Sequence, residues 1–203
     1  MSVRGEADVR SIPCREGGEF DGTHVFRAVW SDRWAAGEPY PPLIPPVTTG
    51  RWNDEQHPTV YTSHEPAVAL REKLEHLGPE TWAGSLLAAS GRPVRTSIVV
   101  VGFDPLPVQT YDGRGVLNPK DLFPPLLAQD YGPARAFSRA CRDQGDASLI
   151  VPSAPLFRDT GEFRWNQAFF VGGRGQPHVD DFPGPKEMTV ECEAALAERL
   201  SGH

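Results

Sequence analysis

Prolines and glycines divide this 203-residue chain into short segments, and these breaks limit its fold more than any other sequence feature. The 21 prolines and 20 glycines are a larger share than average proteins contain. They concentrate in residues 38–46, 104–125 and 172–185, which are therefore predicted to be loops. Strand and helix patterns follow one another irregularly between these loops and give no βαβ repeat. This arrangement favours a single α+β domain over a doubly wound sheet.

The negative net charge of the chain argues against some classes of ligand. The formal net charge is −7 and the pI is near 5.4. A protein whose main ligand is nucleic acid needs a basic surface for the phosphates, so direct nucleic-acid binding is not expected. A local group of arginines around a small phosphorylated ligand is compatible with this charge.

Cysteine usage and the N-terminal sequence favour the cytoplasm. Cys14, Cys141 and Cys192 are odd in number and far apart, which fits reduced thiols better than a disulfide framework. The N-terminus has no basic segment followed by an apolar run, so no signal peptide is expected. No apolar run approaches the length of a bilayer span. We therefore expect a cytoplasmic protein without a membrane segment.

Hydrophobic periodicity predicts the elements between the loops. Apolar runs indicate strands at residues 23–30, 58–62, 95–103, 147–154 and 165–172. Helical spacing indicates helices at residues 66–77, 132–142 and 186–200, with a shorter one at 80–90. Residues 1–22 show no period and are expected to be a loosely held arm. The functional domain is therefore placed at residues 23–203, with its core motifs within 23–172.

The stretch of residues 50–77 concentrates polar chemistry. A Gly-Arg-Trp-Asn turn presents a cation, an aromatic ring and an amide together. The strand after it carries Tyr61, and the helix after that carries Glu72. Pro66 suits the first turn of this helix, because its missing N–H breaks no intrahelical bond there.

The position of Glu72 on its helix leaves two interpretations open. The predicted core stripe of the helix consists of Ala67, Leu70, Leu74 and Leu77. Glu72 lies on the opposite face, where periodicity predicts an ordinary solvated glutamate. Val68 and Ala69 share that face, and the alternative interpretation is therefore that the face lines a half-apolar cleft.

Several common kinds of site lack support. His57, His64 and His76 have no zinc-protease spacing, so no metal site is expected. The glycine clusters at residues 113–115 and 172–175 lack the Lys-Ser or Lys-Thr of a phosphate loop. Ser153 lies in Val-Pro-Ser-Ala and lacks a nucleophile elbow, which leaves a Ser153 hydrolase as an unsupported alternative.

The remaining polar residues suit a pyridine dinucleotide as substrate. They are Arg27, Arg51, Tyr61, Glu72, Ser153 and Asn166. Arginines pair with a diphosphate through bidentate hydrogen bonds, and a tyrosine ring stacks on nicotinamide. A carboxylate stabilises the oxocarbenium-like state that develops as the ribosyl–nicotinamide bond breaks. Hydroxyl and amide groups orient ribose or phosphate oxygens.

The order of these motifs resembles the RES domain family, which is named for an arginine, a glutamate and a serine. The matching segments are FRAVW with Arg27, then GRWN, VYTS and AVALREKLEHL with Glu72, then LIVPSA with Ser153 and WNQAFF with Asn166. The resemblance covers residues 23–172. The combination of GRWN, VYTS and a glutamate-bearing helix is its most specific part.

The resemblance implies a fold and an activity. RES proteins are commonly toxins of bacterial toxin–antitoxin pairs, with a fold similar to ADP-ribosyltransferase toxins and a twisted or split, mostly antiparallel sheet flanked by helices. Members degrade NAD+ by hydrolysis or phosphorolysis, or transfer ADP-ribose to a protein. Their antitoxin carries a DNA-binding domain and a segment that blocks the active site, and dimers are expected from the family.

The resemblance also assigns roles. Arg27, Arg51 and their neighbours Trp52 and Asn53 are expected to bind NAD+ together with Tyr61 and Asn166. The expected catalytic set is Glu72, Arg27, Tyr61 and Ser153. No cofactor is required, since NAD+ is the substrate and inorganic phosphate is a candidate co-substrate.

We therefore predict an enzyme that cleaves the nicotinamide–ribose bond of NAD+ and is neutralised by an antitoxin. An ADP-ribosyltransferase acting on a protein is the alternative, and a non-catalytic binding module is the second.

Overall fold

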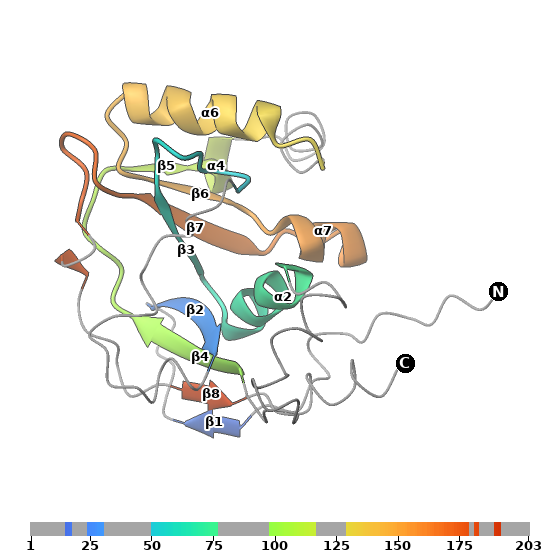
Figure 1. Cartoon of the computed structure of the whole chain (residues 1–203). Helices are drawn as coiled ribbons and strands as arrows, with labels where there is room; N and C mark the ends of the chain where they lie inside the picture. Colours follow the sequence, from blue (N-terminus) through green and yellow to red (C-terminus); the bar gives the residue numbers. More distant parts are fainter. Residues whose placement is uncertain are drawn as a thin grey trace, which may run out of the picture.

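The computed structural model describes residues 15–17, 24–30, 50–76, 98–116, 129–178, 181–182 and 189–191. Within these ranges, eight strands form one sheet in the order β1-β8-β4-β2-β3-β7-β6-β5 (Figure 1). The strands are β1 Arg15–Gly17, β2 Val25–Trp30, β3 Thr59–Ser63, β4 Ile98–Phe103, β5 Thr110–Asp112, β6 Ser148–Pro152, β7 Trp165–Phe170 and β8 Thr189–Glu191. The helices are α2 Pro66–His76, α4 Gly113–Val116, α6 Gly132–Asp143 and α7 Ala154–Thr160. The prediction of an α+β fold is confirmed.

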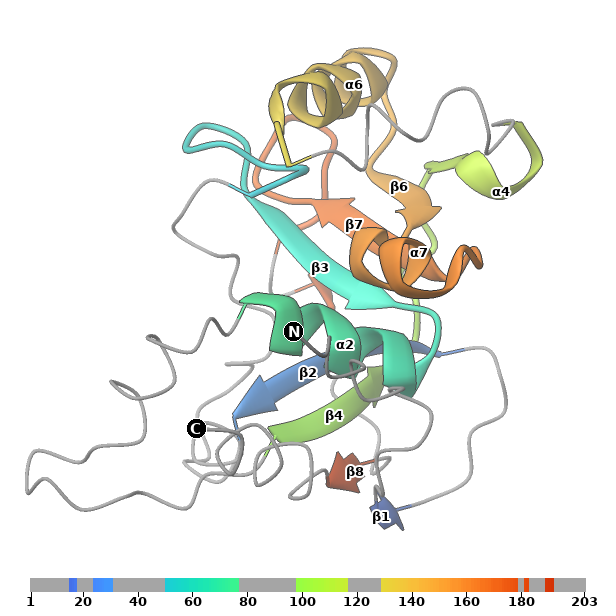
Figure 2. The same ribbon diagram turned by 90° about the vertical axis from the view of Figure 1, so that its right-hand side faces the viewer.

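The sheet is split in the middle. Strand β2 pairs with β4 over six residues and β3 pairs with β7 over five, whereas β2 and β3 share only the Phe26–Ser63 pair. Only β5 and β6 are parallel among these paired strands. Helix α2 lies beside the junction of the two halves, as Figure 2 shows. The split, mostly antiparallel sheet expected from the family resemblance is therefore present.

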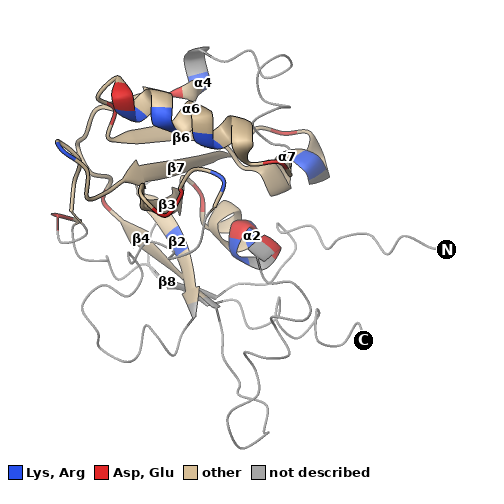
Figure 3. Ribbon diagram, turned by 45° about the horizontal axis from the view of Figure 1, so that its top comes forward, with Lys and Arg blue, Asp and Glu red and all other residues tan. Residues whose placement is uncertain are grey.

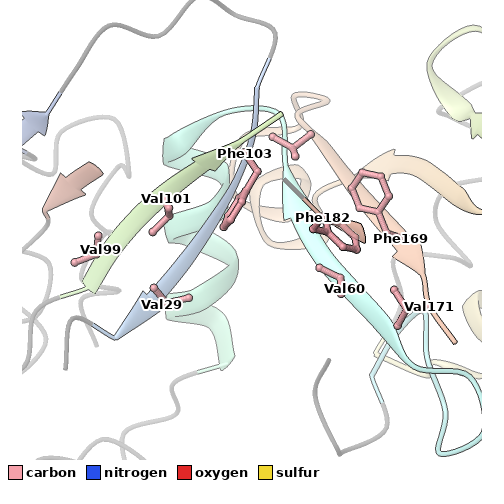
Figure 4. Close-up of a cluster of buried hydrophobic side chains, with 9 residues drawn as sticks. Val29, Val60, Val99, Val101, Phe103, Phe169, Val171 and Phe182 are labelled. Carbon is pink, nitrogen blue, oxygen red and sulfur yellow. The ribbon is translucent and has the colours of Figure 1, made fainter. Parts of the chain in front are cut away.

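Two apolar clusters form the described core. One cluster, shown in Figure 4, joins the strands of both halves through Val29, Val60, Val99, Val101, Phe103, Phe169, Val171 and Phe182. The other packs α6 and α7 against the second half through residues that include Trp52, Cys141, Leu149, Ala154 and Phe170. Alternating apolar residues on β2, β4 and β7 supply both faces of the sheet, which explains why these strands could be predicted from sequence.

Helix α2 buries Leu70 of the predicted stripe and also residues outside that stripe. Val68, Ala69, Leu70 and Arg71 are buried, whereas Ala67 is only half-buried. The side chains of Leu74 and Leu77 lie outside the described residues. The apolar pair Val68 and Ala69 therefore belongs to the core, because the helix packs on the twisted sheet rather than on one simple stripe.

Three predicted regions need correction. Residues 189–191, predicted as part of a C-terminal helix, form β8 between β4 and β1. Residues 15–17 of the predicted arm form β1. Residues 110–116, predicted as loop, contain β5 and α4. Strand pairing stabilises β1, β5 and β8 through distant partners that a local pattern does not reveal.

Helix α7 was missed, although its start signals are present. Ser153 is its N-cap, Pro155 lies in its first turn, and Gly161 ends it in the left-handed conformation with φ of 69°. The helix predicted at residues 80–90 lies outside the described residues. None of the described helices is long and apolar enough to cross a membrane.

Candidate active site

The carboxylate of Glu72 is held on one side by two hydrogen-bond donors. Its Oε1 atom accepts a 2.7 Å hydrogen bond from the Ser153 hydroxyl and a 2.6 Å hydrogen bond from the Asn166 amide. These donors come from the start of α7 and from β7, whereas Glu72 comes from α2. Three elements therefore fix the carboxylate, and Glu72 is not the solvated surface residue that periodicity predicts.

The amide of Asn166 is oriented by a residue that sequence reasoning missed. The buried Ser63 hydroxyl donates a 2.7 Å hydrogen bond to Asn166 Oδ1. Ser63 and Asn166 face each other in the register of β3 and β7. An ionised carboxylate only accepts hydrogen bonds, so Asn166 must turn its NH2 group towards Glu72 and its oxygen towards Ser63. The chain of donors therefore runs from Ser63 through Asn166 to Glu72.

Glu72 keeps one oxygen for a ligand. Its side chain is half-buried, and no described residue donates a hydrogen bond to its Oε2 atom. Two charge-assisted hydrogen bonds at Oε1 restrict the carboxylate to one orientation without occupying the second oxygen. Glu72 can therefore accept a hydrogen bond from a bound hydroxyl, or stabilise positive charge, through Oε2.

Ser153 acts on Glu72 and on α7 at the same time. Its hydroxyl donates to Glu72 and accepts a 3.4 Å hydrogen bond from the Leu156 N–H. Its exposed fraction is 0%. This burial does not favour a hydrolase nucleophile, and contact of Ser153 with a substrate stays a prediction of the family resemblance. We assign Ser153 to positioning.

Tyr61 fixes the turn of residues 50–53. Its hydroxyl donates a 2.6 Å hydrogen bond to Asn53 Oδ1 and accepts a 2.9 Å hydrogen bond from the Trp52 N–H. Burial raises the pKa of Tyr61, so the phenol stays neutral and can donate. Trp52 and Asn53 are 3% and 2% exposed, so their buried side chains form part of the scaffold of the turn.

Helix α6 holds the same turn from its other side. Arg135 Nε donates a 2.9 Å hydrogen bond to the Gly50 carbonyl, and Ser138 Oγ donates a 2.8 Å hydrogen bond to the Trp52 carbonyl. Arg142 donates to the His57 carbonyl and to Thr59 Oγ1. These residues lie three or four positions apart and thus on one helical face. The spacing of Arg135, Ser138 and Arg142 is the one feature of the sequence that could have indicated a polar helical face in this position.

Arg51 belongs to this turn and interacts electrostatically with Glu72. Its guanidinium carbon is 4.6 Å from the centre of the Tyr131 ring. Burial lowers the pKa of Arg51, while the nearby Tyr131 and Glu72 side chains act in the opposite direction. Arg51 is therefore within electrostatic reach of the carboxylate, as expected for a cation that holds the phosphates of a ligand whose sugar lies at Glu72.

Arg27 is a half-buried cation at the junction of the two half-sheets. Its Nη1 atom is out of reach of solvent. Burial lowers the pKa of Arg27 to about 10, and the nearby Tyr61 acts in the opposite direction. The side chain is still charged at neutral pH. Figure 3 shows the basic positions on β2 and along α6, on either side of β3.

The structure thus brings the predicted site residues into two groups. Glu72, Ser153 and Asn166 form one hydrogen-bonded group. Tyr61, Asn53 and Trp52 form another, with Arg51 beside it. A small pocket between α2 and α7 contains none of them and is lined by Glu65, Ala67, Val68, Leu156, Thr160, Glu162 and Arg164. Sequence reasoning missed Ser63, Tyr131 and Arg135.

A family model agrees with the motif order. One solved structure that resembles the chain is the Mycobacterium tuberculosis MbcT-MbcA toxin–antitoxin complex, at 12% identity and a TM-score of 0.45, covering 95% of this chain and 94% of that chain. No curated protein matches the sequence. The family model described as "RES domain" matches residues 24–182, about three quarters of the chain. The protein therefore belongs to the RES domain family.

Proposed function

We propose that this protein cleaves the nicotinamide–ribose bond of NAD+. The observation that carries the proposal is the carboxylate of Glu72, with Oε1 fixed by Ser153 and Asn166 and Oε2 left for a ligand. A carboxylate in one fixed orientation stabilises developing positive charge without having to reorganise during the reaction. Membership of the RES domain family supports the same assignment.

The reaction needs little covalent help from the protein. The bond between ribose C1′ and the nicotinamide nitrogen breaks, and its electron pair neutralises the pyridinium ring. Glu72 Oε2 stabilises the oxocarbenium-like sugar, either through a ribose hydroxyl or through its charge. An oxygen of water or phosphate then bonds to C1′, and water loses a proton in that step. The positions of the ribose and acceptor decide the rate.

The cations supply binding rather than chemistry in this proposal. Arg51 is within electrostatic reach of Glu72, so it is suited to hold the diphosphate next to the nicotinamide ribose. Arg27 adds a second positive charge close to Tyr61. The half-buried Tyr61 ring remains our candidate to pack on nicotinamide, while its hydroxyl holds the turn of residues 50–53.

We also propose that the protein works as a toxin. Its family membership supports this role, together with a partner antitoxin that carries a DNA-binding domain. Loss of cellular NAD+ would then account for toxicity. Expression of the wild type in bacteria should lower NAD+ and arrest growth, whereas Glu72→Gln should do neither.

The deciding test is NAD+ consumption by the purified protein, followed by NMR with and without phosphate. Nicotinamide released only with phosphate identifies a phosphorylase, and release in both conditions identifies a glycohydrolase. Glu72→Gln should lower the rate by about 10²–10³-fold, since it removes the charge that stabilises the transition state. The matched control is Glu162→Gln on the exposed turn before β7, which should keep wild-type activity.

Two results would contradict this proposal. An active Glu72→Gln protein would remove the carboxylate from its role. Intact NAD+ in both buffers would exclude small acceptors, and labelling of protein by tagged NAD+ would then identify an ADP-ribosyltransferase instead.

A further inference from the structure

Two arginines share one aromatic ring beside the candidate active site. Tyr131 directly precedes α6, and its ring centre lies 4.6 Å from the guanidinium carbon of Arg51 and 5.7 Å from that of Arg135. Both arginines and the tyrosine are half-buried. Stacking on a ring restrains each guanidinium at low entropic cost and does not use the N–H groups at its edge.

Arg135 is fixed in place without being neutralised. Its Nε atom donates to the Gly50 carbonyl at 2.9 Å, which leaves the two terminal NH2 groups of the fork. No carboxylate among the described residues lies within ion-pair distance of Arg135, and the first turn of α6 carries no acidic residue. The neutral Gly50 carbonyl thus orients the Arg135 guanidinium without cancelling its positive charge.

Three other described arginines differ in this respect, because each pairs with a carboxylate. Arg139, one turn further along α6, has its Nη1 atom 3.3 Å from Asp54 Oδ2. Arg164 is 3.2 Å from Glu65, and Arg158 pairs with Glu75. In each of these pairs a carboxylate of the protein neutralises the charge of the arginine. Arg135 keeps its charge for a ligand.

We propose that Arg135 and Tyr131 form, together with Arg51, a subsite that binds the diphosphate of a dinucleotide. Arg135 holds the backbone of Gly50, the residue directly before Arg51, so the position of one guanidinium group depends on the position of the other. A diphosphate carries two negative charges and offers oxygens to both forks, which a single phosphate or a carboxylate does less well. The identity of the ligand rests on the proposed function, whereas the binding of a phosphorylated anion does not.

The test measures binding rather than turnover. Calorimetry would compare ADP-ribose, which carries the diphosphate, with nicotinamide riboside, which carries no phosphate. Arg135→Gln should weaken ADP-ribose binding about tenfold or more, as loss of a charge-assisted contact does. Nicotinamide riboside binding should stay within about twofold of wild type, because it makes no contact with the lost charge. Arg139→Gln is the matched control and should bind both ligands like the wild type.

Several outcomes would overturn the subsite. Unchanged ADP-ribose binding by Arg135→Gln would do so, as would a wild type that binds neither ADP-ribose nor pyrophosphate. An equal loss of affinity for both ligands in Arg135→Gln would indicate that Arg135 only supports the turn. Tyr131→Ala checks this, because it leaves the Arg135–Gly50 hydrogen bond intact. If Tyr131→Ala also does not weaken ADP-ribose binding selectively, the subsite is refuted. If NAD+ is not cleaved but ADP-ribose binding still depends on Arg135, the proposed function fails and the subsite stands.

Discussion

Ser63 shows how a residue that touches no ligand can control the candidate catalytic carboxylate. Its hydroxyl is buried and points at Asn166 Oδ1, so it decides which end of the amide faces Glu72. The VYTS motif contains Ser63 but gives it no role, because a serine at the end of a strand is common. The signal appears only when the register pairs Ser63 with Asn166.

At the residue scale, we predict that Ser63→Ala lowers kcat for NAD+ cleavage about tenfold while KM changes little. The amide of Asn166 loses its fixed orientation, and a hydrogen bond to a charged group is worth about 1.5–3 kcal/mol. Steady-state kinetics measure both parameters, and thermal unfolding confirms that the variant is folded.

A double-mutant cycle separates this role from a general packing effect. If Ser63 acts through Asn166, the double variant Ser63→Ala, Asn166→Ala is no slower than Asn166→Ala alone. Rate losses that multiply would show that the two residues act independently and would refute the relay.

At the scale of elements, the turn of residues 50–53 depends on a helix that lies far along the chain. Helix α6 donates side-chain hydrogen bonds to the carbonyls of Gly50 and Trp52, and Tyr61 ties the turn to β3. Gly50 is required because its neighbours come very close. A Cβ atom added there would lie 2.4 Å from Asn53 Oδ1 and 2.8 Å from the Tyr61 hydroxyl.

Gly50→Ala should therefore displace Asn53 or Tyr61 and reduce the free energy of unfolding by about 1–3 kcal/mol. NAD+ cleavage should fall as well, since Arg51 follows the displaced residue. Urea denaturation measures the stability, and Gly173→Ala is the control. A Cβ atom at Gly173 would meet only the end of the Gln176 side chain, which can move aside. Equal losses in both variants would contradict the role of the tight turn.

The elements also show what sequence could and could not predict. Strands β2, β3, β4, β6 and β7 and helices α2 and α6 carry their own periodic or β-branched patterns, and each was predicted to within a few residues. Strands β1, β5 and β8 are three residues long and depend on partners elsewhere in the chain. The motif residues of the site were predicted, but Tyr131 and Arg135 were not, because only the fold brings α6 to the turn.

At the scale of the whole molecule, α2 connects the two halves of the split sheet. Strands β2 and β3 share a single residue pair, so side-chain packing must hold the halves together where the backbone does not. Helix α2 contacts β2, β3, β4 and β7, and it also contacts α7. Its Leu70 is 1% exposed, on the helix that carries Glu72. The geometry of the carboxylate and the stability of the domain therefore depend on the same packing.

Leu70→Ala tests this coupling. Truncating a buried leucine leaves a cavity and should lower the free energy of unfolding by about 2–5 kcal/mol. Because the cavity lies at the junction, α2 should shift against β7, and the Asn166–Glu72 hydrogen bond should lengthen. We therefore expect kcat to fall even at temperatures where the variant is fully folded, as urea denaturation and kinetics on the same sample would show. Arg139→Ala truncates an exposed ion pair instead and should cost no more than about 1 kcal/mol. A Leu70→Ala protein that is destabilised but retains wild-type kcat would mean that the site is positioned by β7 and α7 alone, without help from the packing of α2.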